Sequence, residues 1–581
     1  GPTLSLGDRF GGDVVSLGDL NGDGVSELAV GAWGDDTGGT DAGAVHILFM
    51  EPEPMTSVLY VDADSTYDIS EGDSGTSWAT ALPDLEDAYD LIPIINEGRD
   101  PADFIQTIWI AEGVYLPRVH SDADNDGLID DDDVRSKTFT LLDGVSIYGG
   151  FAGDEADLAS RHGGATILSG DLNRDDATGG DNSENAYTVV TVSFPEKTTI
   201  LDSVTITGGN ANCDDPYWVC AGVYGGGIFV EDTSPEDGIL VLKNVNVTEN
   251  YSESSGGGIC VAKSQLYAIN TTIDSNSSGG KGGGIHNWAG DTILVNCVIA
   301  NNSAVFSGGG ISNPFDTIRI YNSTIVNNTT GRYGGGAYLS DVALVYNSIF
   351  ADNTAAELHP TLYIFGYEVV VRNTFIDEGE NIHGVTHGVD GNIVGTPSTP
   401  IDPYFTDPST GDYGLQLESL AINSGSISAG LPFDEYDIDR DGDTTERLPL
   451  DRNGDVRLIA ERVDMGAYEA TDIGYDFGDA PDPTYPTLLA NDGARHYPVG
   501  PLLGYLRDGE RDGQPSANAD GDDLIVKADE DGLMSLSDVA PGRKDVILSV
   551  HASLGSYLNA WIDFNANGIW DSSEQIAVDE E

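Results

Sequence analysis

The sequence predicts an all-β protein built around a parallel β-helix, and three observations support this fold class. A Gly-Gly-Gly triplet recurs at steps of 26 residues, starting at Gly256, Gly282, Gly308 and Gly334. Asparagine and aliphatic residues recur in phase with it. Segments such as IYNSTIV and ALVYNSIF are short, alternating and rich in β-branched residues, which is typical of strands. A fixed period in the twenties indicates units that stack, because none buries its apolar face alone.

Three in-phase columns predict the bends and the interior of the repeat. The first asparagine column consists of Asn244, Asn270, Asn296, Asn322, Asn347 and Asn373. The second consists of Asn250, Asn276, Asn302, Asn328 and Asn353. The apolar column consists of Val247, Ile273, Ile299, Ile325, Phe350 and Ile376. We expect the asparagines to stack and bond at the bends, glycine to supply positive φ at another bend, and Ile299 and Ile325 to face inward. Sequons such as Asn322-Ser-Thr are alternative glycosylation acceptors, but their place in the ladder favours a structural role.

No helical pattern separates the strands, which disfavours leucine-rich and helical repeats. A family resemblance lies in the order of the segments around the coils. Before the coils come, in order, YVDAD, GTSWATAL, IWIAEGVYLP, GVSIYGGFAG, TILSGDLN and LDSVTITGGNAN, and after them comes DRNGDVRLIAERVDMGAYE. Residues 57–470 resemble the right-handed parallel β-helix of bacterial secreted surface proteins, related to the polymorphic outer-membrane repeat group. The segment PDLEDAYDLI (83–92) has a helical pattern, and we expect it to cap the first coil.

The flanking regions carry resemblances of their own. FGGDVVSLGDLNGDGVSELAVGAWGD (10–35) resembles one FG-GAP repeat, a propeller blade, within a domain of residues 1–50. A linker, EPEPMT, follows at residues 51–56. Residues 471–581, with YDFGDAPDPTYPTL and WIDFNANG, resemble a GEVED-type module that is β-rich and sandwich-like. One blade does not close a propeller, and the module stops soon after WIDFNANG, so both ends are expected to be cut from a larger polypeptide.

Composition limits the partners of the chain. Its 98 Asp and Glu against 25 Lys and Arg give a net charge of −73 over 581 residues. Such a surface repels nucleic acid and anionic membranes, and it favours a cation-rich medium or bound cations. No stretch reaches the roughly 18 unbroken apolar residues of a spanning helix, so no direct membrane insertion is expected. The opening GPTLSLGDRF shows no export signal.

The four cysteines indicate the redox compartment. Cys213 and Cys220 flank a short loop and are close enough in sequence for a local disulfide, which hints at an oxidising compartment. Two free thiols are the alternative for this pair. Cys260 and Cys297 are expected to be unpaired strand residues.

Crowded carboxylates point to calcium. DADNDGLIDDDD (122–133) holds seven carboxylates in twelve residues, and repulsion at that density opposes a compact loop without a cation inside it. Ca²⁺ takes six to eight oxygens, from a loop with Asp or Asn at positions 1, 3 and 5, glycine at 6, a carbonyl at 7 and a carboxylate at 9 or 12. No His or Cys accompanies these loops, so zinc is not expected. A solvated acidic turn is the alternative for each loop.

Four loops follow this spacing. In the opening stretch the ligands fall on Asp122, Asp124, Asp126, Leu128, Asp130 and Asp133. Near the C-terminus they fall on Asp563, Asn565, Asn567, Ile569, Asp571 and Glu574. In the FG-GAP-like stretch they fall on Asp19, Asn21, Asp23, Val25 and Glu27, with an apolar Val30 at position 12. In the fourth loop they fall on Asp437, Asp439 and Asp441, with Thr445 at position 9.

No catalytic constellation is visible. A polysaccharide lyase needs a base beside Ca²⁺, and a hydrolase needs converging carboxylates. Asp175 and Asp176 lie in an irregular loop. The candidate bases of the coils are scattered over different columns: Lys263, Lys281, His286, Arg319 and Arg332.

We therefore do not expect the chain to be an enzyme. We expect a secreted, calcium-stabilised structural or adhesive protein of the bacterial cell surface. It is a candidate subunit of an extracellular filament or surface layer. Expected partners are copies of itself, other surface proteins or polysaccharide. A carbohydrate-active or carbohydrate-binding β-helix is the alternative, which a lateral groove lined by acids, a base and aromatics would favour.

Overall fold

The computed structural model assigns an all-β architecture to the chain. The residues that the structure describes are 10–18, 27–33, 43–48, 57–66, 74–97, 99, 104–118, 134–176, 180–193, 197–213, 223–231, 238–357, 361–366, 368–379, 382, 384–439, 441–458, 463–470, 476–493, 495–496, 512–517, 532–536, 547–551, 557–565, 567 and 572–580. The chain divides into two units: one comprises residues 1–59 and 90–106, and the other comprises residues 60–89 and 107–581. The domain boundaries expected from the sequence stay predictions.

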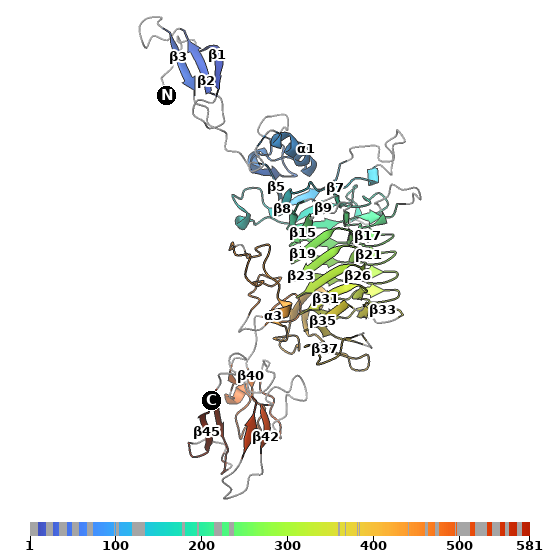
Figure 1. Cartoon of the computed structure of the whole chain (residues 1–581), viewed down its shortest axis with the longest axis vertical. Coiled ribbons are helices and arrows are strands. Elements are labelled where there is room, and N and C mark those ends of the chain that lie inside the picture. The colour runs from blue at the N-terminus through green and yellow to red at the C-terminus, as the bar shows by residue number, and fades with distance from the viewer. Residues whose placement is uncertain are drawn as a thin grey trace. The chain divides into compact units, whose positions relative to one another are not determined.

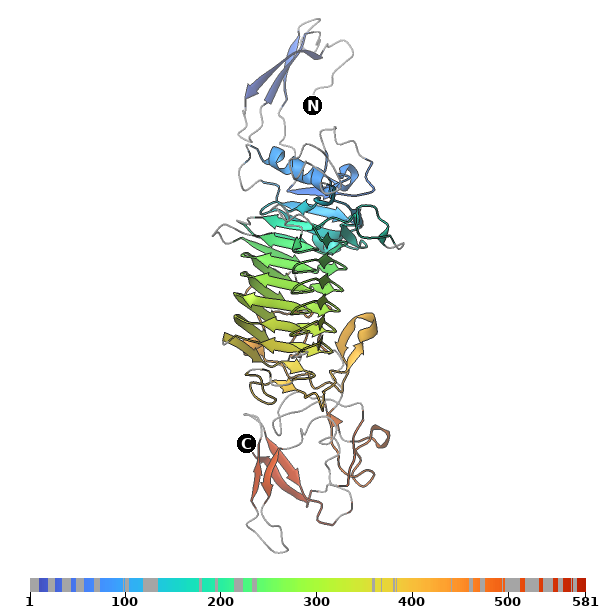
Figure 2. The same cartoon turned by 90° about the vertical axis from the view of Figure 1, so that its right-hand side faces the viewer.

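Among the described residues, four stacked sheets form the parallel β-helix (Figures 1 and 2). Sheet I contains β7 (Phe139–Thr140), β10 (Val190–Ser193), β14 (Ile228–Glu231), β18 (Ile259–Ala262), β22 (Ile285–Trp288), β26 (Ile311–Phe315), β30 (Ala337–Leu339) and β34 (Leu362–Ile364). Sheet II contains β4 (Val58–Val61), β5 (Thr107–Ala111), β8 (Ser146–Phe151), β11 (Thr199–Asp202), β15 (Ile239–Lys243), β19 (Gln265–Ile269), β23 (Asp291–Val295), β27 (Thr317–Tyr321), β31 (Val342–Tyr346) and β35 (Glu368–Arg372).

Sheets III and IV complete each coil. Sheet III contains β6 (Gly113–Tyr115), β9 (Thr166–Ser169), β12 (Val204–Thr207), β16 (Asn246–Thr248), β20 (Thr272–Asp274), β24 (Val298–Ala300), β28 (Thr324–Val326), β32 (Ile349–Ala351), β36 (Phe375–Ile376) and β37 (Ile393–Val394). Sheet IV contains β13 (Asn210–Ala211), β17 (Tyr251–Ser252), β21 (Ser277–Ser278), β25 (Ser303–Ala304), β29 (Thr329–Thr330) and β33 (Thr354–Ala355). Each strand of the repeat pairs in parallel with the strand one coil away. The predicted fold class is confirmed.

The apolar column forms the interior of sheet III. Val247, Ile273, Ile299, Ile325, Phe350 and Ile376 are each 0% exposed. Ile299 is in register with Ile273 on one side and Ile325 on the other. The prediction that Ile299 and Ile325 stack inward is therefore confirmed. Each aliphatic side chain covers the next, so apolar burial is continuous along the coils.

Both asparagine columns lie at bends, as predicted. In the second column each side-chain amide donates to the side-chain oxygen one coil away: from Asn250 to Asn276, and on through Asn302 and Asn328 to Asn353, each bond is 3.0 Å long. The first column adopts the left-handed conformation, with φ from +44° to +56°. Asparagine tolerates this region better than most residues. The first glycine of each triplet also has positive φ, for example +64° at Gly282.

The predicted cap is helix α1 (Leu85–Asn96), which begins later and ends later than the expected 83–92. It continues past Pro93, which lacks the N–H for one helical hydrogen bond. Leu85 and Ala88 are fully buried. Arg118, which follows β6, donates a 2.7 Å hydrogen bond to Asp87.

The cysteines are partly as predicted. Cys213 is disulfide-bonded, and Cys220 lies outside the described residues. Cys260 and Cys297 are free and buried. Cys260 lies in strand β18, but Cys297 does not lie in a strand. It occupies the bend between β23 and β24, where its thiol contacts the carbonyl oxygens of Ala268 and Val295.

Smaller antiparallel sheets accompany the β-helix. β1 (Phe10–Gly18), β2 (Glu27–Ala32) and β3 (Ala44–Leu48) form one sheet. Two-stranded sheets pair β38 (Phe405–Asp407) with β39 (Asp412–Leu415), β40 (Asp476–Phe477) with β41 (Arg495–His496), β42 (Leu533–Leu536) with β43 (Leu548–Val550), and β44 (Leu558–Trp561) with β45 (Gln575–Glu580).

Residues 420–470, here called the strap, return along the outside of the coils after the last strand of sheet III (Figure 1). The strap contains the short helix α3 (Ile427–Gly430), and residues 440 and 459–462 of it lie outside the described part. Leu431, Leu448 and Val463 pack against Val241 and Tyr267 of sheet II. A second group, around Met465 and Ala467, packs against sheet III. The strap therefore covers apolar residues that the coils would otherwise expose.

Candidate metal centre

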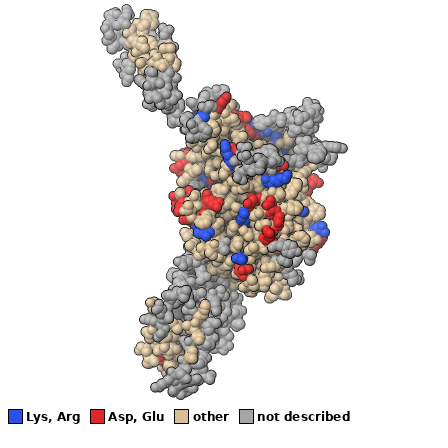
Figure 3. Space-filling model, in the orientation of Figure 1, with Lys and Arg blue, Asp and Glu red and all other residues tan. Residues whose placement is uncertain are grey.

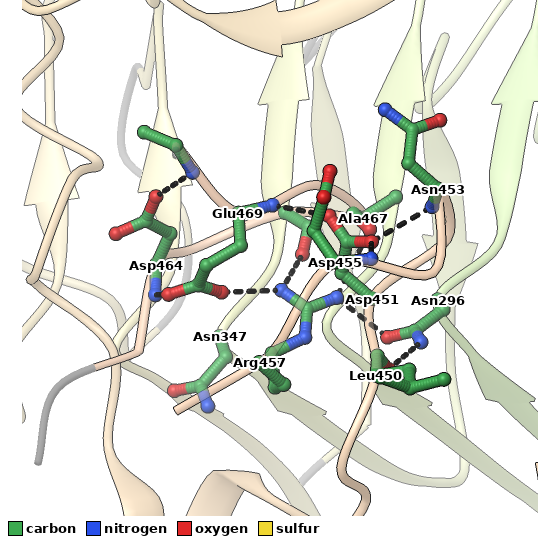
Figure 4. Close-up of polar contacts among 12 residues, drawn as sticks. Asn296, Asn347, Leu450, Asp451, Asn453, Asp455, Arg457, Asp464, Ala467 and Glu469 are labelled. Carbon is green, nitrogen blue, oxygen red and sulfur yellow. Dashed lines mark hydrogen bonds and ion pairs between the residues drawn. The ribbon is translucent and has the colours of Figure 1, made fainter. Parts of the chain in front are cut away.

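A buried arginine holds the strap on the bends of the coils. Arg457 is 0% exposed, and its guanidinium donates to Oε2 of Glu469 at 3.0 Å and to Oδ1 of Asn296 at 2.6 Å (Figure 4). Asn296 in turn donates to the carbonyl oxygen of Leu450 at 2.9 Å. The Glu469 carboxylate also accepts from the backbone N–H of Asp464 at 2.8 Å. The charges of this network are paired by an ion pair and by backbone hydrogen bonds.

Two further basic residues fix the strap nearer its acidic loop. Arg452 donates to the backbone oxygen of Asn270 and to the hydroxyl of Thr272. Lys243, at the end of β15, donates to the carbonyl oxygens of Tyr436 (3.1 Å) and Asp437 (3.0 Å). These contacts hold the chain at both sides of residues 438–446.

Carboxylates gather within this loop in two overlapping groups. One oxygen each of Asp437, Asp439 and Asp441 lies within 4.8 Å of the others, and the same holds for Asp434, Asp439 and Glu446. Gly442 has a φ of +89° and donates its N–H to Oδ1 of Asp437 at 3.2 Å. The positive φ explains glycine at this place, because it turns the chain back toward Asp437.

Asp434 is the buried member of the second group. It is 1% exposed, and its Oδ2 accepts from the N–H of Ile438 at 2.7 Å. Its Oδ1 is buried without a hydrogen-bond partner, and so is Oε1 of Glu446. Buried carboxylate oxygens are costly when they are unpaired, and here two of them belong to one acidic group.

The pKa values of these carboxylates reflect the crowding. Burial raises the pKa of Asp434, and the charges of Asp439 and Asp437 raise it further, against the opposing effects of the Ile438 N–H and Lys243. Burial also raises the pKa of Glu446, with added repulsion from neighbouring aspartates of the loop. Both shifts signal that ionisation is disfavoured in the absence of a compensating cation.

The structure brings the predicted Asp437, Asp439 and Asp441 together and adds two residues that sequence reasoning missed. Asp434 precedes the first loop position by three residues, and Glu446 occupies its tenth position rather than the ninth or twelfth. Thr445, at position 9, does not replace a carboxylate in the group, since its hydroxyl donates to Asp443 at 2.7 Å. Seven carboxylates within thirteen residues (434–446) were the available signal.

The loop near the C-terminus is described in part. Asn565 donates to Oε1 of Glu574 at 2.7 Å, and Glu574 is 2% exposed. The N–H of Asn567 donates to Oδ1 of Asp563 at 3.2 Å. Position 3 thus contacts position 12 through the amide nitrogen of Asn565, and calcium binding by this loop stays a prediction. Gly568, Ile569 and Asp571 lie outside the described residues.

Comparison with known proteins identifies an FG-GAP repeat and a distantly similar solved structure. Residues 11–48 match the FG-GAP repeat. No curated protein matches the chain. The crystal structure of pectate lyase Pel9A is similar at 12% identity and a TM-score of 0.34, covering 71% of this chain and 96% of that chain. In the described part of the chain, no helix is long and apolar enough to cross a membrane.

The matched FG-GAP repeat agrees with the resemblance seen at residues 10–35. Its predicted ligands Asp19, Asn21, Asp23 and Val25 lie outside the described residues, and Glu27 opens β2. The stretch with Asp122, Asp124, Asp126, Leu128, Asp130 and Asp133 also lies outside the described residues. Calcium binding by these two loops stays a prediction.

Another acidic group was not predicted as a site. One oxygen each of Asp171, Asp175, Asp176 and Glu184 lies within 4.8 Å of the others. Burial raises the pKa of Asp176 and of Glu184, and neighbouring aspartates add to both shifts. The signal was Asp171, Asn173 and Asp175 at positions 1, 3 and 5, although Asp176 replaces the glycine at position 6.

A third group, Asp154, Glu155 and His162, is explained without a metal. The Glu155 carboxylate accepts from four backbone N–H groups, including Ala152 at 2.7 Å and Gly153 at 3.0 Å. Burial alone would raise its pKa, but these hydrogen bonds outweigh burial and lower the pKa to about 2. Its oxygens are therefore already satisfied by the backbone.

Proposed function

We propose that this chain is an extracellular structural or adhesive β-helix protein of the bacterial surface, in which Ca²⁺ fixes the strap to the coils. The observation that carries the proposal is the buried Asp434, whose Oδ1 lacks a partner beside Asp439 and Glu446. A cation at this place would supply the missing charge compensation for several oxygens at once.

The ligand chemistry favours calcium over other metals. Asp434, Asp437, Asp439, Asp441 and Glu446 offer oxygen atoms alone, and hard oxygen donors suit Ca²⁺ and Mg²⁺. Ca²⁺ accepts higher and less regular coordination than Mg²⁺, which demands a near-ideal octahedron. An irregular surface loop that offers five candidate carboxylate ligands fits Ca²⁺ better.

Calcium bound at the loop would affect how the strap packs on the β-helix. The loop directly follows Tyr436, whose carbonyl oxygen accepts a hydrogen bond from Lys243 and whose ring centroid lies 4.6 Å from that of Tyr267. Without a cation, repulsion among the carboxylates opposes this docking. With the cation bound, the strap keeps Leu431 and Leu448 on sheet II. The metal would thereby stabilise the lateral cover of a solenoid.

Other features support an extracellular place. Cys213 is disulfide-bonded, which is typical of oxidising compartments. Acidic side chains form several patches over the β-helix (Figure 3), and such a surface is best tolerated where cations are abundant.

Assembly into a filament or layer, through copies of the chain or other surface proteins, is part of the proposal. Electron microscopy with and without calcium tests it, since single particles under both conditions would oppose it.

Isothermal titration calorimetry of the full chain with Ca²⁺, after removal of metal by chelation, tests the strap site. We expect Asp434→Asn combined with Glu446→Gln to lose one binding event and part of the calcium-dependent rise in melting temperature. Asp443→Asn is the matched control, because Asp443 lies in the same loop, outside both acidic groups, and bonds Thr445. An unchanged stoichiometry and melting curve in the double variant would contradict the proposal.

A further inference from the structure

A cavity of about 380 Å³ opens on sheet I, away from the strap loop. Aromatic and polar side chains line it together, among them Tyr224, Lys281, His286, Trp288, Phe306 and Phe315. Lys281 and His286 looked scattered in the sequence, because they fall in different columns. The coil brings them to one place, since both flank the same Gly-Gly-Gly triplet.

Residues that differ in size between consecutive coils form one wall of the cavity. The register aligns Phe229 with Cys260, so a large residue neighbours a small one. Tyr224 and Phe229 pack over the small Cys260 and Ala262 in one apolar cluster. The ring of Tyr224 then lies 6.2 Å from that of Trp288, with an angle of 30° between them.

Three aromatic rings that line the cavity are exposed to solvent. Trp288 is 43% exposed, and Phe315, its partner in register one coil further, is 56% exposed. Phe306 is 47% exposed. Single exposed apolar residues need no explanation, but three large rings around one cavity mark an interaction site. Neighbouring strands lie about 4.8 Å apart, so Trp288 and Phe315 form consecutive steps along the coils.

One lining residue, His286, is almost fully buried. His286 is 6% exposed, and its Nδ1 is buried without a hydrogen-bond partner. Burial, together with the charge of Lys281, lowers the pKa of His286 to about 4. The imidazole is therefore neutral at physiological pH, and a backbone hydrogen bond with Ser312 engages its ring.

The chemistry of the lining identifies the class of ligand. A pyranose ring has an apolar C–H face and a rim of hydroxyl groups, which match exposed aromatic rings beside polar side chains such as Ser254 and Lys281. Among the described lining residues, Glu253 supplies an acid and Lys281 a base, so the charges balance. The chain as a whole carries a net charge of −73, which repels polyanions.

We propose that this cavity binds a neutral glycan, whose sugar rings pack on Trp288 and Phe315 and whose hydroxyl groups meet the polar side chains of the lining. The site is independent of the strap loop, so it does not depend on calcium at Asp434. It gives the β-helix a specific adhesive surface. A peptide would also pack on aromatic rings, but the polar side chains and the balanced charges of the lining favour the glycan.

Calorimetric titration of the full chain with soluble neutral polysaccharides tests the proposal, with mixed-linkage β-glucan, xyloglucan and galactomannan as probes and polygalacturonate as the anionic counterpart. We expect at least one neutral probe to bind. Trp288→Ala and Phe315→Ala should each weaken that binding at least tenfold, with an unchanged melting temperature because both rings are exposed.

The matched control is Phe365→Ala, an aromatic residue that is 69% exposed and lies outside the cavity. It should bind like the unaltered chain. The proposal is overturned if none of the neutral probes binds, if polygalacturonate alone binds, or if Trp288→Ala and Phe315→Ala bind the neutral probe as well as Phe365→Ala does. Loss of self-association in place of glycan binding would assign the rings to a protein contact instead.

Discussion

The guanidinium of Arg457 donates a 2.6 Å hydrogen bond to the side-chain oxygen of Asn296, a residue 161 positions earlier in the chain. Asn296 belongs to the first asparagine column, whose left-handed backbone places one amide at the same bend of every coil. The strap pairs with several of these amides. Asn347, for example, exchanges two hydrogen bonds with the backbone of Ser426, at 2.7 and 3.0 Å.

Asn322 and Asn347 allow the strap contacts to be tested at matched positions. Both are 0% exposed and have similar φ values of +45° and +48°, but neither side-chain polar atom of Asn322 has a partner. Glycine tolerates this φ. We expect Asn347→Gly to cost about 2 kcal/mol in the free energy of unfolding, because the Ser426 groups lose their partners. Asn322→Gly should cost less than about 1 kcal/mol. Equal losses in denaturant titrations would show that the strap bonds contribute little.

The ion pair of Arg457 predicts a large effect of a single substitution. Arg457→Met leaves the Glu469 carboxylate buried without its cation, so we expect a loss of about 3–5 kcal/mol in the free energy of unfolding. Arg332→Met is the control, because its pair with Glu357 is exposed (47% and 46% for the two side chains) and is worth about 1 kcal/mol or less. Chemical denaturation of both variants measures the difference. Similar losses would mean that solvent reaches the Arg457 pair.

In the second asparagine column, the stability cost of a substitution should depend strongly on the position within one bend. Asn302 is fully buried; its amide donates to the Ile273 carbonyl at 2.8 Å and its oxygen accepts from the Asn276 N–H at 3.0 Å. Asn302→Ala leaves these groups unpaired, so we expect a loss of about 3 kcal/mol or more. Its neighbour Asn301 is exposed, with a φ of +55°. Asn301→Gly should change stability by less than about 1 kcal/mol. Thermal unfolding of the two variants tests the ladder.

The periodic parts of the fold could be predicted from the sequence, and the long-range parts could not. Ile299 and Asn302 recur in phase, so their neighbours are the same positions one coil away. The partners of Arg457 follow no period, since Asn296 lies 161 residues away. Side-chain pairing over such distances leaves no local pattern to read.

The candidate sites show the same division. The spacing of Asp437, Asp439 and Asp441 identified the acidic loop, but Asp434 and Glu446 fall outside the spacing template and join through the fold of the strap. The cavity on sheet I depends on differences between coils, such as Trp288 beside Phe315. A search for repeating residues misses such candidate sites, because their residues stand at positions where the repeat changes.

Asp377 predicts a pH dependence of stability with a definite sign. Burial, with a smaller contribution from Asp352, raises its pKa to about 6, even though Thr361 and two backbone N–H groups donate to it. A raised carboxyl pKa means that the folded state binds the proton more tightly than the unfolded state. The stabilisation is therefore complete below pH of about 4, and it is lost as pH rises from about 4 to 6.

Asp377→Asn removes this titration, because an amide does not ionise. Relative to the unaltered chain, the variant should gain on the order of 2 kcal/mol in the free energy of unfolding between pH 4 and 6, and the difference should be flat above pH 7. The difference between the free energies of unfolding of the two chains cancels the contributions of the other titrating groups, because both chains share them. Glu368→Gln, at an exposed strand position, should show no such step. Urea titrations at unit pH intervals decide the matter, and a variant that loses stability between pH 4 and 6 would show that the carboxylate is favoured when charged.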